Sequence, residues 1–432
     1  MIKETIQELY KFAPQLLGAG IDNCFEYIKP LIGLDIIEIK SGTQLETWTV
    51  PDEWIAKEAW VKDPSGNKII EYKNDLSLMV YSSPFKGKVD REELKRHLFI
   101  NKDLPDATPY QFSFYEKKWG FCLPANKVFK TEVNTTETKQ VDVLPEGEYE
   151  VFIDTEFKPG IMKLGVHTVP GKIDREILLF AHLDHPYQAN DNLSGVVCLL
   201  DLALRLKDKY QHTIKIIFCP ETIGSIGYAL TQDISKVDFM IAVDICGSDT
   251  QPTVQWSFDP QNRLNRIAHL AMMMGDESFA MNRFRAYLGS DEYVFNDPQI
   301  GIPGLMYTRA PYQEYHTSAD TPDIILEDKI VACQQFIENV ITIYENDFIP
   351  VRKFKGPLFR TKFGIQSPVK GINAQMDYLF YNIDGKRYLS EIVDACEMNW
   401  RFSYDTMQKL IAENLIEKKI GNSRTPRSKK KK

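Results

Sequence analysis

Two histidines and two aspartates lie within the fifteen residues AHLDHPYQANDNLSG, which run from Ala181 to Gly195. This stretch directly follows the apolar segment REILLF, whose composition is typical of a buried strand. Burial of a charged side chain costs free energy unless the charge is paired or bound to a metal ion. The stretch is therefore either an exposed polar loop or the beginning of a metal site.

His182 and Asp184 form an H-x-D pair at the end of that predicted strand. Residues two apart in a strand lie on one face, so this carboxylate can orient the imidazole, as carboxylates do beside metal-bound histidines. Asp191 follows in NDNLSG, before a helix expected from Ser194. An aspartate there can bind a metal ion or cap the helix, and its position in the sequence leaves both interpretations open.

Two further carboxylates follow two further predicted strands. Glu221 comes after IKIIFCP and is either an exposed strand-end residue or, near a metal ion, a base that takes a proton from water. Asp244 follows the apolar residues FMIAV directly, which predicts a deep position.

The last candidates lie further along the chain. His316 occurs in EYHTSADT, directly after Tyr315, and the segment GSDEYVF contains Asp291, Glu292 and Tyr293. Imidazole nitrogen and carboxylate oxygen are suitable zinc ligands. The two tyrosines, Asp291 and Glu292 are expected to support the site or to contact a substrate.

Alternating strand and helix patterns between about residues 160 and 345 must position these side chains. Strands are predicted in EILLFAHL, IKIIFC, FMIAVDI and GIPGLMYT, and helices in SGVVCLLDLALRLKDKY, RLNRIAHLAMMMG and EDKIVACQQFIENVITIYEN. Such alternation predicts an α/β sheet covered by helices, in which ligands bind at the C-terminal ends of strands.

The rest of the chain has other patterns of residue spacing and composition. Residues 2–32 have helical spacing, about 35–150 is aromatic and β-rich, and the segment after FIPVRKFKGP has three short helical patterns. We predict a discontinuous α/β domain at 1–40 and 141–350, an inserted β-rich domain at 41–140, a winged-helix-like domain at 355–422 and a basic tail at 423–432. The aromatic residues of the insert are expected mainly in its core, with a lid, a substrate-selecting wall or an oligomer contact as the functional alternatives.

Composition limits the class of protein. The 432 residues are 43% hydrophobic and 26% charged, with a net charge of −8, which is typical of a soluble globular protein and not of one that coats nucleic acid. The sequence has no signal peptide pattern and no membrane-length apolar run. Seven cysteines without a C-x-x-C pair favour a reducing compartment, here the cytoplasm, and argue against a cysteine zinc site.

The predicted C-terminal domain is only weakly basic. Residues 355–432 contain 16 Lys and Arg against 8 Asp and Glu, but six of the basic residues follow Gly421. This distribution favours packing against protein, including a homo-oligomer, over DNA binding, which stays an alternative. No membrane partner is expected.

The ordered motifs AHLDH, NDNLSG, ETIGSIG, VDICG, GSDEYVF…GIPGLMY and YHTSADT resemble those of zinc aminopeptidases with two cooperating metal ions. With SGTQLETWTVPDEW, YSSPF and PYQFSFYEKKWGFC, the chain is similar over nearly its whole length to a bacterial subfamily often labelled polysaccharide-biosynthesis proteins with an aminopeptidase-like domain. The resemblance implies a mixed sheet flanked by helices, an inserted β-domain and a C-terminal winged helix.

The resemblance also implies roles for single residues. His182 and Asp244 would bind one zinc ion, Asp191 would bridge two, and His316 would bind the second. Asp184 would orient His182. Glu221 would be the general base that activates water for attack on a peptide or amide carbonyl.

One position departs from the family pattern. The family has two adjacent glutamates, the second a metal ligand, whereas this chain has Glu221 followed by Thr222. Threonine hydroxyl is a poor zinc ligand, so we expect one zinc well bound by His182, Asp191 and Asp244. A second zinc would bind weakly or would recruit another group, such as Glu292.

The sequence thus predicts a zinc hydrolase of aminopeptidase type acting on a small peptide or amide. Two alternatives stay open: an amidase or deacylase acting on an amide-bearing sugar in polysaccharide synthesis, and a non-catalytic metal-binding regulator that acts through the winged helix.

Overall fold

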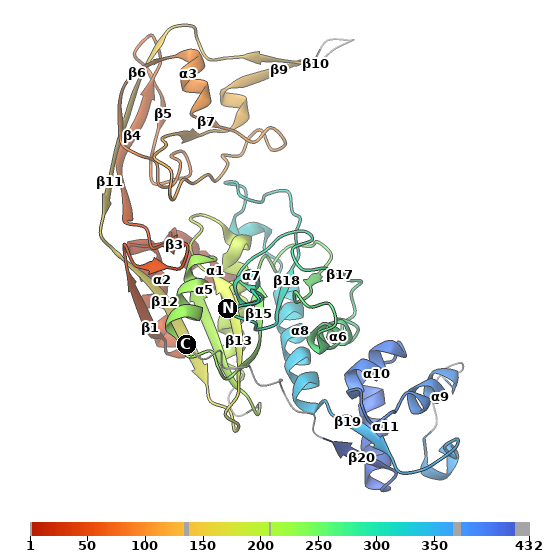
Figure 1. Cartoon of the computed structure of the whole chain (residues 1–432). Coiled ribbons are helices and arrows are strands. Elements are labelled where there is room, and N and C mark those ends of the chain that lie inside the picture. Colours follow the sequence, from red (N-terminus) through yellow and green to blue (C-terminus); the bar gives the residue numbers. More distant parts are fainter. Residues whose placement is uncertain (1, 134–137, 207–208, 366–372, 420–432) are drawn as a thin grey trace.

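A central sheet of eight strands forms the body of the computed structural model, which describes residues 2–133, 138–206, 209–365 and 373–419 (Figure 1). The middle strands are parallel and the outer ones mostly antiparallel. The strand order is β1 (Asp35–Lys40), β12 (Ile161–Val169), β14 (Thr213–Cys219), β13 (Glu176–His182), β15 (Val237–Val243), β18 (Gly304–Thr308), β16 (Thr253–Gln255) and β17 (Ala280–Asn282).

Alternate residues of the central strands pack on opposite faces of this sheet, as the period of two requires. Ile177, Leu179 and Ala181 of β13 pack into one hydrophobic core, while Leu178 and Phe180 pack into the other. Both faces of these strands are buried, which is why the sequence shows nearly continuous apolar runs there. The predicted α/β fold is confirmed.

Helices cover both faces. The first core contains side chains of α1 (Ile2–Lys11), α2 (Ala19–Ile32), α4 (Ser194–Ala203), α6 (Arg263–Met272) and α8 (Glu327–Asn346). The other contains those of α5 (Ile223–Thr231) and α7 (Glu292–Phe295). No helix in the described ranges is long and apolar enough to cross a membrane.

An inserted β-rich region rises above the body on the long strands β4 (Glu53–Lys62) and β11 (Glu148–Lys158) (Figure 1). These pair in a sheet ordered β5 (Lys68–Glu71), β4, β11 and β6 (Phe85–Asp90). The region also contains the short helix α3 (Arg91–Arg96). Two further strand pairs belong to it: β7 (Leu98–Phe99) pairs with β8 (Phe121–Cys122), and β9 (Phe129–Val133) pairs with β10 (Thr138–Asp142). A hairpin of β2 (Gln44–Leu45) and β3 (Trp48–Thr49) precedes the region. β11 belongs to this sheet although it follows the predicted boundary at residue 140.

The C-terminal module packs on α6 below the body (Figure 1). It contains α9 (Asn373–Tyr381), α10 (Leu389–Ala395) and α11 (Trp400–Ala412), with β19 (Ile349–Arg352) paired to β20 (Ile416–Lys419). The Asp347 carboxylate accepts hydrogen bonds from the Ser390 hydroxyl at 2.6 Å and from Arg263 of α6 at 2.7 Å. These two hydrogen bonds join the C-terminal module to the body. The three helical patterns are confirmed, the winged helix stays a prediction, and the predicted tail lies outside the described residues.

Candidate metal centre

His182 lies at the C-terminal end of β13 and is 1% exposed. Its Nδ1 is 3.1 Å from Asp184 Oδ1, so the carboxylate fixes the ring and leaves Nε2 available as a ligand atom. Nε2 is 3.1 Å from Asp191 Oδ1 and 3.3 Å from Asp244 Oδ1. The H-x-D pair therefore has the orienting geometry that the sequence suggested.

Asp191 occupies the centre of the cluster, in the short turn Ala189–Leu193 that precedes α4. Its Oδ1 faces His182, and its Oδ2 is 2.8 Å from His316 Nε2. Burial favours the neutral acid, but His185, His182 and His316 hold the pKa of Asp191 well below its ordinary value. The Asp191 side chain makes no capping hydrogen bond to α4, so the ligand interpretation fits this position better.

Neighbouring strand ends supply the other two carboxylates. Asp244 directly follows β15 and is 4% exposed, as its apolar run predicted. Glu221 follows β14, and its ligand atom lies within 4.8 Å of those of His182 and Asp244. Burial raises the pKa of Glu221 to about 8, although His182 and His185 oppose the shift.

His185 completes a second group, together with Asp191 and His316. Its Nδ1 is 3.4 Å from Asp191 Oδ1, and its ring lies 4.7 Å from that of His182 and 5.1 Å from that of His316. His185 lies in the stretch from Ala181 to Gly195, but its sequence position indicated no role for it. Strand alternation would turn it away from His182, but β13 ends at His182 and the chain turns there.

Glu292, the residue predicted to replace the missing glutamate, has a different place. It belongs to none of the groups of candidate ligands found among the described residues. It is fully buried, and its Oε2 accepts a hydrogen bond from Ser290 N at 2.9 Å. Asp291 is equally buried and accepts from Thr222 N at 3.0 Å, so it holds the turn that carries Glu221.

The two predicted tyrosines differ. Tyr315 stacks on His316 with ring centroids 4.0 Å apart and is 39% exposed. Tyr293 is exposed and lies against Arg285. Only Tyr315 therefore contacts a residue of the cluster.

A residue without a predicted role supports the Asp191 turn. The Asp320 carboxylate accepts hydrogen bonds from Asn190 N at 2.7 Å and Asp191 N at 3.2 Å. The Tyr312 hydroxyl donates to the same carboxylate at 2.6 Å. These contacts fix the backbone that presents Asp191.

The donor set fits zinc. Three imidazoles and several carboxylates are brought together in a buried site, and these are the N and O ligands that zinc takes. His185 Nδ1 and His316 Nε2 are buried and converge on the two oxygens of Asp191, at 3.4 Å and 2.8 Å. Imidazole nitrogens that converge on one carboxylate are placed as ligand atoms of a shared metal ion would be.

Three cysteines form a separate buried group that the sequence did not predict. Cys198, Cys246 and Cys333 come from α4, the loop after β15 and α8, and their sulfur atoms lie within 4.8 Å of one another. Three elements contribute one cysteine each, so no C-x-x-C spacing marks the cluster. A metal count on this protein must distinguish it from the histidine site.

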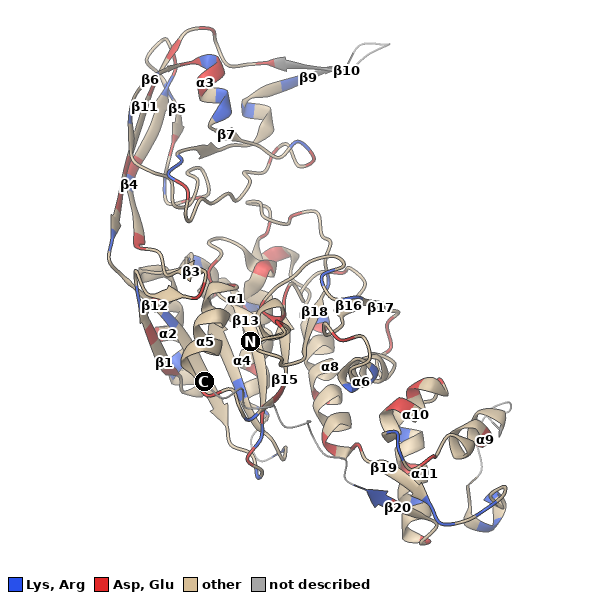
Figure 2. Ribbon diagram, in the orientation of Figure 1, with Lys and Arg blue, Asp and Glu red and all other residues tan. Residues whose placement is uncertain are grey.

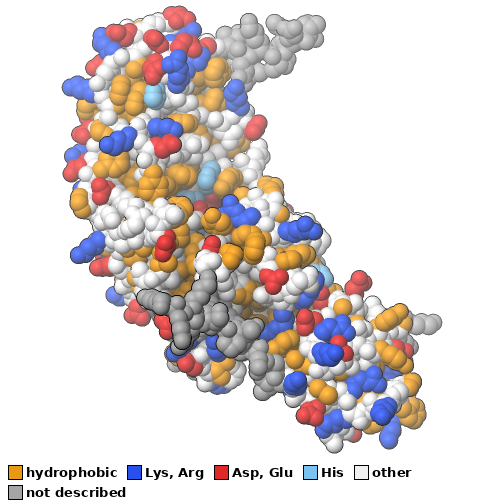
Figure 3. All heavy atoms as spheres, in the orientation of Figure 1, with side chains coloured by type: hydrophobic (Ala, Val, Ile, Leu, Met, Phe, Trp, Pro, Cys, Tyr) orange, Lys and Arg blue, Asp and Glu red, His pale blue; other side chains and the backbone are white. Residues whose placement is uncertain are grey.

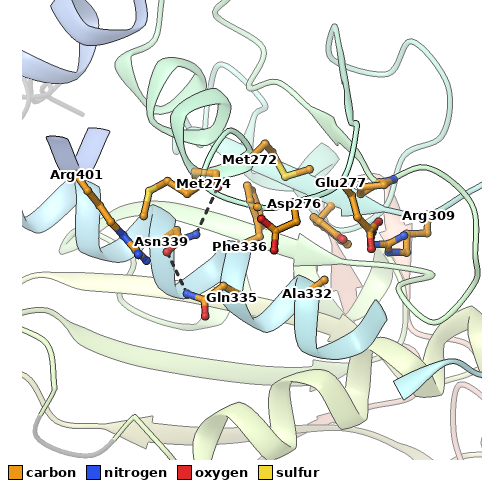
Figure 4. A pocket seen from close by; sticks show the side chains of 14 residues that line it. Met272, Met274, Asp276, Glu277, Arg309, Ala332, Gln335, Phe336, Asn339 and Arg401 are labelled. Carbon is orange, nitrogen blue, oxygen red and sulfur yellow. Dashed lines mark hydrogen bonds and ion pairs between the residues drawn. The ribbon is translucent and has the colours of Figure 1, made fainter. Parts of the chain in front are cut away.

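A pocket on another part of the body is lined by α6, α8 and the start of α11 (Figure 4). Met272, Met274 and Phe336 give it an apolar wall, and Arg309 and Arg401 lie at its two ends. None of the predicted ligands lines it, and Arg309 is bound to Glu277 at 2.7 Å. The candidate ligand groups that contain histidine therefore lie outside this pocket.

The chain is similar to known proteins over most of its length. Residues 3–347 match the family described as a domain of unknown function, DUF4910. A Clostridium acetobutylicum protein, named as a candidate polysaccharide biosynthesis protein with an aminopeptidase-like domain, is 33% identical over 416 residues, or 93% of this chain and 92% of that protein.

Solved structures show the same fold. A candidate peptidase from C. acetobutylicum is similar with a TM-score of 0.79 and 28% identity, over 97% of this chain and 96% of that chain. A zinc aminopeptidase from Bacillus subtilis is similar with a TM-score of 0.57 and 14% identity, over 79% and 93%. The chain therefore belongs to the DUF4910 family, and its body has the fold of the zinc aminopeptidases.

Proposed function

We propose that this protein is a zinc-dependent hydrolase of aminopeptidase type that cleaves a peptide or amide bond in a small substrate. The fold similarity supports a peptidase-type hydrolase. The observation that carries the finer proposal is the convergence of His182, Asp191 and Asp244 with Glu221 at adjacent strand ends. His182, Asp191 and Asp244 would hold the zinc ion.

Zinc, when bound, supplies a Lewis acid that polarises the scissile carbonyl and makes water more acidic. Glu221 would take the proton from the attacking water and deliver it to the leaving amine. Its carboxylate lies within 4.8 Å of the ligand atoms of His182 and Asp244, within reach of a water molecule held there. Asp184 would keep the His182 ring in its binding orientation.

A second zinc ion would be held by His185, Asp191 and His316. The support is the pair of buried nitrogens on His185 and His316, which converge on Asp191 at 3.4 Å and 2.8 Å. His185 would thus take the place of the ligand glutamate that the resembled family has at the position of Thr222.

A second candidate function is hydrolysis of an amide on a sugar. Exposed aromatic rings bind sugar faces, and two lie beside the cluster: Tyr315 stacks on His316, and Phe112 packs against Tyr110 with ring centroids 5.6 Å apart. Their exposed fractions are 39% and 44%. The Clostridium acetobutylicum relative is named for polysaccharide biosynthesis, which supports a sugar-containing substrate.

Turnover of two substrate panels, aminoacyl p-nitroanilides and N-acetylated hexosamines, tests these proposals on zinc-loaded protein. We expect Glu221→Gln to lower kcat by about 10²–10⁴-fold with unchanged zinc content. The control Glu156→Gln alters a carboxylate of the inserted region that pairs with Lys57, and it should leave kcat unchanged. Zinc binding without turnover of either panel would contradict both hydrolase proposals and favour the regulator.

The C-terminal module is proposed to pack against protein, in a homo-oligomer, more readily than to bind DNA. Basic and acidic residues are interspersed over it (Figure 2). Its exposed aromatic residues are Phe359, Tyr378 and Tyr381, each at least 66% exposed. Analytical ultracentrifugation of wild type and Tyr378→Ser tests this: a monomeric wild type would exclude the homo-oligomer.

A further inference from the structure

The inserted region reaches into the metal centre at Tyr110. Thr108 N donates to Ser318 Oγ at 3.0 Å, Ser318 N donates to Thr108 O at 2.7 Å, and Tyr110 N donates to His316 O at 2.7 Å. This short pairing fixes residues 108–110 along the loop that carries His316. Figure 3 shows histidine and acidic side chains in the hollow between the inserted region and the body.

The pairing places the Tyr110 ring among the ligand histidines. Its centroid lies 5.2 Å from that of His185 and 5.2 Å from that of His316, and it meets the His316 ring nearly edge-on at 82°. Tyr110 is 1% exposed. A residue of the inserted region is therefore a wall of the site.

The Tyr110 hydroxyl has no hydrogen-bond partner among the residues that the structure describes. Other tyrosines nearby do not share this property: the Tyr312 hydroxyl donates to Asp320, and Tyr315 and Tyr293 are exposed. A buried hydroxyl without a partner is unfavourable, so such a group calls for an explanation. An oxygen atom that enters the site with the substrate would provide the missing acceptor.

We infer that Tyr110 is a catalytic residue whose hydroxyl donates a hydrogen bond to the carbonyl oxygen of the scissile bond. The inference rests on the proposed hydrolase function. As water adds to the carbonyl carbon, the C=O π electrons move onto that oxygen, and the Tyr110 O–H stabilises the developing negative charge while keeping its own proton. The inserted region thus completes the active site instead of only covering it.

Tyr110→Phe tests this role because it removes the hydroxyl and keeps the ring. The matched control is Tyr149→Phe, a buried tyrosine of the inserted region whose hydroxyl donates to Pro145 O at 2.6 Å. Both zinc-loaded variants are compared with wild type in kcat and KM on aminoacyl p-nitroanilides, in zinc content and in melting temperature. Affinity for L-leucinephosphonic acid, a tetrahedral anion, is measured by calorimetry.

For Tyr110→Phe we expect kcat to fall by about 10²-fold and the phosphonate Kd to rise by about ten-fold. KM, zinc content and melting temperature should stay near the wild-type values, and Tyr149→Phe should retain wild-type kcat and Kd. Unchanged kcat and phosphonate Kd, or loss of zinc, in Tyr110→Phe would overturn the inference.

Failure of the hydrolase proposal has a different signature. If wild type turns over no p-nitroanilide, the Kd for the phosphonate alone tests the role of Tyr110. Weaker phosphonate binding by Tyr110→Phe than by wild type would support the hydroxyl as donor to a substrate oxygen. Equal binding, or no binding by wild type, overturns it.

Discussion

Two buried histidine–carboxylate clusters lie at opposite ends of the same parallel strands. At the N-terminal ends, His212 is hydrogen-bonded through Nδ1 to Glu345 at 2.9 Å and through Nε2 to Asp238 at 3.0 Å. At the C-terminal ends, His182 is joined by His185 and His316 around Asp191. Residue types and burial are similar in both places.

The difference lies in how the imidazoles and carboxylates are arranged. Both nitrogens of His212 are hydrogen-bonded, and its two carboxylates approach opposite sides of the ring, where they cannot share one ion. At the other end, three imidazoles converge on the single carboxylate of Asp191. The first cluster joins α8 to the sheet, whereas the second brings together the donor atoms that a metal ion needs.

Removing one histidine from each cluster should have the largest and most contrasting effects. His182→Ala should abolish the first zinc site and lower turnover by more than the roughly 10²-fold typical of losses in supporting residues. His212→Ala should leave zinc content unchanged and lower the free energy of unfolding by about 2 kcal/mol, because Asp238 and Glu345 each lose one hydrogen bond to the ring. Zinc analysis and urea unfolding measure both. Equal zinc loss in the two variants would remove the distinction.

The second metal position should depend on His185 and not on Glu292. Calorimetric titration with zinc should give two sites for wild type, one for His185→Ala and two for Glu292→Gln, because only His185 faces Asp191 and His316. A single site in Glu292→Gln with two in His185→Ala would restore the original prediction from the sequence.

A smaller effect is expected from the residue that holds the Asp191 turn. Asp320→Asn weakens the acceptor of two backbone N–H groups and of the Tyr312 hydroxyl. Zinc affinity should fall by about ten-fold. The exposed Asp233→Asn serves as control, and a change of equal size there would show that the effect is not local.

The smallest contrast concerns pH. Burial disfavours the charged form of His212, but Asp238 and Glu345 outweigh it and raise the pKa of His212 above its ordinary value. Its contribution to stability is therefore complete below about pH 6.5 and is lost as pH rises through the raised pKa. The difference in urea midpoint between wild type and His212→Gln should shrink from pH 6 to pH 9. A difference that grows over this range would contradict a raised pKa of His212.

Zinc binding should have the opposite pH trend. Ligand histidines must lose their protons to bind, and negative charge from Asp191 and Asp184 outweighs burial to raise the pKa of His185 to about 9. Apparent zinc affinity should therefore increase over the same pH range in which the His212 contribution declines.

The central sheet was predictable because its signals are local. The strands before His182, Glu221 and Asp244 are continuous apolar runs, and parallel strands place their C-terminal ends at one edge. The order of motifs then indicates which side chains meet there. The helices α4, α6 and α8 follow from spacing in the same way.

His185 and Tyr110 needed the structure for different reasons. The strand period assigns His185 to the wrong face, because it cannot show that the strand ends three residues earlier. Tyr110 lies 206 positions before His316 and meets it only through the pairing of two loops. No periodic pattern in the sequence records such a contact.

Anomalous diffraction at the zinc edge, from crystals grown with zinc, tests the central claim most directly. The account predicts one peak beside His182, Asp191 and Asp244, and a second beside His185, Asp191 and His316. A peak only among Cys198, Cys246 and Cys333, or no peak at the strand ends, would contradict it.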